Sequence, residues 1–66
     1  MTEIAILEKL QDMYTKALDE PYVDLTLTCR IDGAIQDVIH AAKYKMDPME
    51  LLRQYHGRVY DLLNKQ

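Results

Sequence analysis

Apolar residues recur at helical spacing in three segments of the 66-residue chain, and two prolines separate these segments. In the first segment, residues 3–18, the apolar side chains fill about 180° of a helical wheel, and charged or polar side chains fill the opposite arc. Glu3 suits the positive end of a helix dipole. We expect this helix to stop near Glu20-Pro21, because the residue before a proline avoids helical backbone angles.

The middle segment supports two interpretations. Residues 23–31 alternate apolar and polar side chains up to Asp32-Gly33, which is typical of a strand followed by a turn. The apolar residues from Leu27 to Ala42 also share one arc of a helix, of about 160°. Residues 34–45 are helical in both interpretations. A lone strand would have to pair with another subunit, so the pattern favours one long helix that begins near Asp24.

The third segment opens with a helix-start signal and stays helical to residue 64. Asp47 stands at the N-cap position, Pro48 at the first helical position and Glu50 at the third. Apolar residues then keep helical spacing through Leu63. Gly57 lies inside this predicted helix, where it costs about 1 kcal/mol relative to alanine and allows a neighbour to approach closely.

These segments predict an all-α fold, with residues 1–66 forming a single helical domain. The expected architecture is a small three-helix bundle or an extended helical hairpin, completed by oligomerisation. The alternative is an α+β fold with an intersubunit strand at residues 23–31. A domain of this size buries only about 60% of the surface of its unfolded chain, and three short helices cannot cover apolar arcs this wide. We therefore expect a homo-oligomer whose interface lies on the first helix, at Ile4, Leu7, Leu10, Met13, Tyr14 and Leu18.

Charge is divided unevenly along the chain. The net charge is −3, and residues 1–37 contribute −5 from three basic and eight acidic side chains, whereas residues 38–66 contribute +2 from five basic and three acidic ones. Nucleic acid is not an expected partner, because binding it depends on neutralising phosphates. The acidic half suits self-association or a larger protein with a basic surface.

No targeting segment or membrane anchor is expected. Glu3 and Glu8 interrupt the apolar stretch near the start, which excludes a secretory leader there. No run approaches the roughly 18 apolar residues of a membrane span. The sequence predicts a cytoplasmic protein without membrane contact.

Enzyme chemistry finds little support in the residues present. The chain has no serine and only two glycines, so serine nucleophiles and glycine-rich phosphate loops are excluded. Cys29 and His40 lie on one side of the middle helix but roughly 16 Å apart, too far for a nucleophile and its base. Cys29 is expected to pack as a small apolar group, buried or half-buried. One cysteine and two histidines match no zinc spacing. We predict no catalytic residues, no metal and no cofactor.

A binding groove is the most specific functional hypothesis from the residues. Polar and aromatic side chains form a stripe on the middle helix and another on the third, and a short turn should place the two stripes side by side. Tyrosine stacks on bases, and arginine and lysine hold phosphate. The groove would bind a nucleotide-like small anion; its predicted residues are Gln36, His40, Lys43, Tyr44, Arg53, His56 and Tyr60. The alternative for these tyrosines is core or interface filling, and for the histidines hydrogen bonding at the surface.

Three functions follow from these patterns. The favoured one is a non-enzymatic protein–protein interaction module, a small regulator or inhibitor that covers part of a larger partner. The second is an oligomeric binder that sequesters or senses a nucleotide-like anion. The third, a DNA-binding regulator, lacks a convincing recognition helix, since only Arg53 and Arg58 could reach a groove. In size, acidity and helical pattern the chain resembles small phage and bacterial regulators, a similarity of type that carries no specific function.

Overall fold

The computed structural model describes residues 2–65, with residue 42 described by its backbone alone. Four helices account for the secondary structure of these residues: α1 (Glu3–Leu18), α2 (Leu25–Lys43), α3 (Pro48–Tyr55) and α4 (Gly57–Asn64). The all-α class is confirmed, and no strand occurs in this part of the chain. Residues 25–31 belong to α2, so the long-helix interpretation of the middle segment is confirmed and the strand alternative is wrong.

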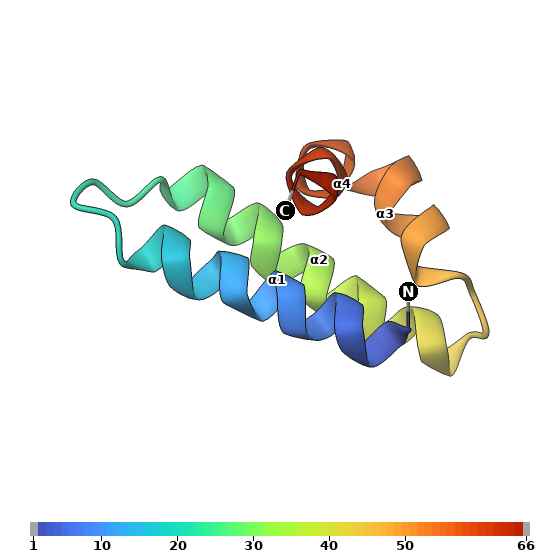
Figure 1. The fold of residues 1–66 in the computed structure, drawn as a ribbon. Helices are drawn as coiled ribbons and strands as arrows, with labels where there is room; N and C mark the ends of the chain where they lie inside the picture. Colours follow the sequence, from blue (N-terminus) through green and yellow to red (C-terminus); the bar gives the residue numbers. More distant parts are fainter. Residues whose placement is uncertain (1, 66) are drawn as a thin grey trace.

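The helices form two layers. Helices α1 and α2 lie side by side as an antiparallel hairpin, and α3 and α4 cover one side of it (Figure 1). In this view α4 is seen nearly end-on, so it runs across the hairpin rather than along it. The molecule is elongated, 38 Å long and 19 Å in each of the other two directions. The loop between α1 and α2 projects at one end of the long axis.

Side-chain caps fix the starts of three helices. Thr2 Oγ1 accepts a hydrogen bond from the Ala5 N–H at 3.2 Å, and Asp24 Oδ1 accepts one from the Leu27 N–H at 3.0 Å. Asp47 Oδ1 accepts from the Met49 N–H at 3.1 Å, which confirms the predicted cap and the place of Pro48 in the first turn. Each cap satisfies an N–H group that has no partner within its own helix.

The core lies between the two layers and draws on every helix. Its most fully buried large side chains come from α1, α2, α3 and α4 in turn: Ile6 and Leu10; Ile31 and Val38; Leu52; and Val59 and Leu63. Thr28 is the one buried polar side chain of the described residues, and its hydroxyl donates to the Leu25 carbonyl at 3.0 Å within the helix. Burial of each large apolar side chain contributes about 1.5–3 kcal/mol.

The predicted third helix is in fact two helices, so the expected three-helix bundle has four. His56 leaves helical backbone angles, with φ −132° and ψ 53°, and α4 begins anew at Gly57. This break lets α4 turn across the hairpin and bury Val59 and Leu63. The chain gives up intrahelical hydrogen bonds at the break, each worth about 0.5–1.5 kcal/mol, and gains the burial of two large side chains.

Helix α2 ends in a left-handed turn without glycine. Lys45 has φ 60°, and the Met46 N–H donates to the Ala41 carbonyl at 2.8 Å, as in a Schellman motif. A side chain with a Cβ costs about 1–2 kcal/mol in this conformation.

Replacing Lys45 with glycine should therefore stabilise the domain by about 1 kcal/mol. In a domain of this size that gain raises Tm by about 4–8 °C, as circular dichroism at 222 nm would measure. Lys45→Ala is the matched control, because it removes the same charge and keeps the Cβ. Equal shifts for Lys45→Gly and Lys45→Ala would contradict the argument from backbone strain.

Candidate functional site

The break between α3 and α4 docks on α2 through His56. The His56 Nε2 atom lies 2.6 Å from Asp37 Oδ2. Because an ionised carboxylate only accepts hydrogen bonds, Nε2 is the donor when Asp37 is charged. The imidazole ring also lies over Gly33, one helical turn before Asp37, where a Cβ would come within 3.8 Å of Cε1. The His56 side chain is largely buried and Asp37 is half exposed, so this pair fastens the break to α2.

Two arginines flank this junction. A shallow hollow of about 30 Å³ is lined by Arg30, Tyr55, His56, Arg58 and Val59. That volume is enough for about one water molecule, so the hollow cannot enclose a nucleotide. Arg58 Nη2 lies 3.7 Å from Asp24 Oδ2, which links α4 to the start of α2. Arg58 therefore helps to hold α4 on the hairpin.

Arg53, the strongest anion-binding candidate in the predicted groove, is paired within its own helix. Its guanidinium donates two hydrogen bonds to Glu50, one turn earlier, and Gln54 donates to Glu50 as well. The hydrogen bond from Arg53, and then that from Gln54, hold the pKa of Glu50 below its usual value. Glu50 in turn raises the pKa of Arg53. An anion at Arg53 would have to compete with this carboxylate.

The other predicted groove residues lie in different settings. Gln36 and His40 are exposed on α2, and Lys43 places its Nζ 5.9 Å from the centre of the exposed Tyr44 ring at the end of α2. Tyr60 is half-buried and packs against the core. Of the seven predicted residues, the hollow at the junction includes only His56. The structure brings His56 together with Asp37, Arg30 and Arg58, none of which we placed in the groove from the sequence.

The predicted interface residues on α1 divide into three groups. Leu10 and Met13 are buried in the core of the single chain, and Leu7 and Tyr14 pack partly against it. Ile4 and Leu18 are exposed. Of these six residues, only Ile4 and Leu18 are exposed, and Leu7 and Tyr14 are half-buried.

The hairpin extends beyond the cover that α4 provides. Past the end of α4, a hollow of about 370 Å³ opens between α1, α2 and α4. Its floor is apolar and its rim is charged; it is lined by Met13, Lys16, Ala17, Glu20, Leu27, Ile31, Leu62 and Lys65. Beyond this hollow the hairpin continues to its projecting loop (Figure 1).

Residues 2–65 contain neither a cluster of metal-ligating side chains nor a buried thiol. In this range no three histidine, cysteine, aspartate or glutamate side chains are grouped so that they could hold a metal ion. Cys29 is exposed, so the expectation that it packs as a buried or half-buried apolar group is wrong. The reason is its position on α2, two residues before the buried Ile31 and on the outer side of the helix.

Comparisons with protein families, curated proteins and solved structures give no significant match. No described helix is both long and apolar enough to cross a membrane.

Proposed function

We propose that this chain is a non-enzymatic protein-interaction module that binds a larger partner through the tip of the α1–α2 hairpin. The observation that carries this proposal is Tyr22, whose side chain is 93% exposed in the projecting loop. The tip consists of residues 18–25 and projects at one end of the hairpin (Figure 1); Asp24, near its end, pairs with Arg58 of α4. An exposed aromatic residue on a projecting element is a favourable anchor for a partner pocket, because tyrosine is enriched among residues that dominate binding energy.

The neighbours of Tyr22 give the tip a chemical character. Val23 and Leu25 add exposed apolar surface beside the ring. Asp19 and Glu20 precede it and are exposed. Asp24 is engaged as the cap of α2 and as the partner of Arg58. Two acidic side chains beside an apolar centre favour a partner with a basic rim around an apolar pocket.

The position of the tip explains how so small a domain could regulate a larger protein. The loop is anchored by α1 on one side and by the capped start of α2 on the other. A loop held in this way loses little conformational entropy when it binds. We infer that the module acts by occlusion: its tip fills a site on the partner, and the two-layer body blocks access to that site.

A photo-crosslinking amino acid at position 22 tests this proposal. We expect it to capture a partner from lysate of the source cells, and the yield should fall as salt is raised. Unlabelled wild-type chain should compete for the partner, whereas Tyr22→Ala should compete at least 10-fold less well, since an aromatic anchor contributes 2 kcal/mol or more. The same crosslinker at position 55, a tyrosine on α3 that is 70% exposed, is the matched control.

Two results would contradict the proposal. One is capture of the same proteins from positions 22 and 55. The other is equal competition by wild-type and Tyr22→Ala chains that show the same helical circular dichroism spectrum.

A further inference from the structure

The side of the hairpin opposite α3 and α4 carries two matching stripes, which we call the open face. On α1 the stripe is formed by Ile4, Leu7, Gln11, Tyr14 and Leu18; on α2 it is formed by Leu25, Thr28, Asp32, Ile35 and Ile39. Both stripes follow alternating steps of three and four residues, the spacing by which one helix packs against another in coiled coils. Because the helices are antiparallel, position 4 lies level with 39, position 11 with 32, and position 18 with 25.

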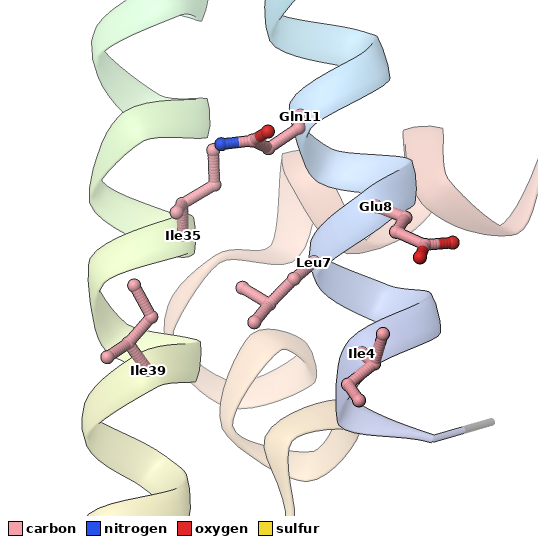
Figure 2. A pocket seen from close by; sticks show the side chains of 6 residues that line it. All are labelled: Ile4, Leu7, Glu8, Gln11, Ile35 and Ile39. Carbon is pink, nitrogen blue, oxygen red and sulfur yellow. The ribbon is translucent and has the colours of Figure 1, made fainter.

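This face is apolar at both ends, and its end residues are exposed, whereas Thr28 and Ile35 are buried at its base. At one end, a hollow of about 210 Å³ lies between the two helices and is lined by Ile4, Leu7, Glu8, Gln11, Ile35 and Ile39 (Figure 2). Figure 2 shows Leu7 directed from α1 into the space between α1 and α2, and Ile39 on the near side of α2. Ile4 is 70% exposed, and at the other end Leu25 is 71% exposed. Among the described residues, four of the nine exposed large apolar side chains lie on the open face: Ile4, Leu18, Leu25 and Ile39.

We propose that a second copy of the chain covers the open face. The two hairpins then pack face to face as a four-helix arrangement, with α3 and α4 of each subunit on the outside. The two-fold axis runs parallel to α1 and α2. Each α1 then packs on α2 of the partner subunit, with the helices antiparallel. The dimer covers Leu18 and Leu25 at the base of the hairpin tip and leaves Tyr22 uncovered at its end, so this inference does not depend on Tyr22.

The polar residues at the middle of the stripes select this arrangement. With the axis parallel to the helices, Gln11 faces Asp32 of the partner subunit, and its amide N–H can donate to that carboxylate. The pair occurs twice, once on each side of the axis. A two-fold axis perpendicular to the helices would instead place Asp32 opposite the partner's Asp32, and like charges facing each other in an interface are unfavourable. The apolar residues at the ends of the stripes also pack on apolar residues in this arrangement: Ile4 contacts the partner's Ile39, and Leu18 contacts the partner's Leu25.

The size of the face predicts a reversible dimer. Helix α2 has 19 residues, which gives a length of about 28 Å, and two adjacent helices are about 20 Å wide. The footprint is therefore roughly 500–600 Å² per subunit, at the lower boundary of specific interfaces. We expect a Kd on the order of 10 μM.

Analytical ultracentrifugation tests the dimer and its surface. Wild-type chain should sediment as a dimer at 200 μM and mainly as a monomer at 1 μM. The Ile39→Glu chain should remain monomeric at 200 μM, because the substitution places a charge where the proposed interface buries an apolar side chain. Tyr55→Glu is the matched control on α3 and should dimerise like the wild type. A wild-type monomer at 200 μM, or an unchanged dimer with Ile39→Glu, would overturn the proposal.

Disulfide trapping tests the direction of the axis. In a Cys29→Ala background, an equimolar mixture of Ile4→Cys and Ile39→Cys chains should form a 4–39 crosslinked heterodimer on oxidation. A mixture of Ile4→Cys and Leu18→Cys chains should not crosslink beyond the level of random collisions. Preferential 4–18 crosslinking would overturn the proposed axis.

Discussion

Replacing Leu10 with alanine should lower the free energy of unfolding by about 2–5 kcal/mol. Leu10 is fully buried at the centre of α1, in the cluster that joins α1, α2, α3 and α4. A domain of this length has a total stability of about 3–10 kcal/mol, so the variant should lose a large fraction of it. We expect Tm to fall by at least 10 °C in thermal unfolding followed by circular dichroism.

The control for Leu10→Ala is Tyr22→Ala, which removes a larger side chain from an exposed position. It should change the free energy of unfolding by less than about 0.5 kcal/mol. Both variants should be compared at 1 μM chain, where the proposed dimer is dissociated. A loss below 1 kcal/mol for Leu10→Ala would show that the four helices do not share the core described above.

Removing the His56–Asp37 pair should cost nearly as much. His56→Ala and Asp37→Ala should each lower the free energy of unfolding by about 1–3 kcal/mol, because hydrogen bonds to charged groups are stronger than neutral ones. The double variant should lose much less than the two single losses combined, and the difference gives a coupling energy of about 1–2 kcal/mol. Urea unfolding of the four chains measures this cycle.

Two further variants show whether the coupling energy comes from the charge, and whether it is specific to His56. Asp37→Asn keeps an oxygen that can accept from Nε2, so it separates the contribution of the charge from that of the hydrogen bond. His40→Ala removes an exposed histidine from α2 and should be nearly neutral. Additive losses in the cycle would mean that His56 and Asp37 do not interact in solution.

The starts of the helices and the core stripes could be predicted from the sequence because their causes are local. The Asp47-Pro48 start depends on one side chain and its neighbours, and the structure contains the expected cap. The alternation at residues 23–31 was ambiguous because Leu25 and Cys29 are exposed apolar or weakly polar residues on the outer side of α2. They filled the apolar positions of a strand pattern without belonging to the core.

The break at His56 could not be predicted because the apolar residues keep helical phase across it. Leu52, Val59 and Leu63 share one face of a continuous helix and are all buried in the broken one. Contacts from another helix decide between the two forms: Gly33 makes room for the imidazole ring, and Asp37 accepts its hydrogen bond. Gly33 and Asp37, four residues apart on α2, were the available signal, although nothing local relates them to residue 56.

The groove was predicted only in part for the same reason. Level pairing of α2 with a straight third helix placed His40 beside residues 55 and 56. However, α3 ends at Tyr55 and α4 runs in a different direction. The polar stripe of the third segment therefore does not continue alongside the polar stripe of α2. His56 reaches Asp37 instead, and Arg53 is held by Glu50 on its own helix. The sequence identified residue types suited to an anion, but their geometry depends on a bend that tertiary contacts create.

The antiparallel pairing of α1 and α2 also affects how fast the chain can fold. Residues 19–24 close the hairpin, and closing a loop of about this size takes on the order of 10–100 ns. The contacts between α1 and α2 join residues that are close in sequence. The hairpin can therefore form in microseconds, as expected for helical proteins with local contacts. Docking of α4 joins residues that are far apart in sequence and should be the slower step. The open face would be exposed from the first moment of folding, so assembly of two copies could begin before α4 is in place.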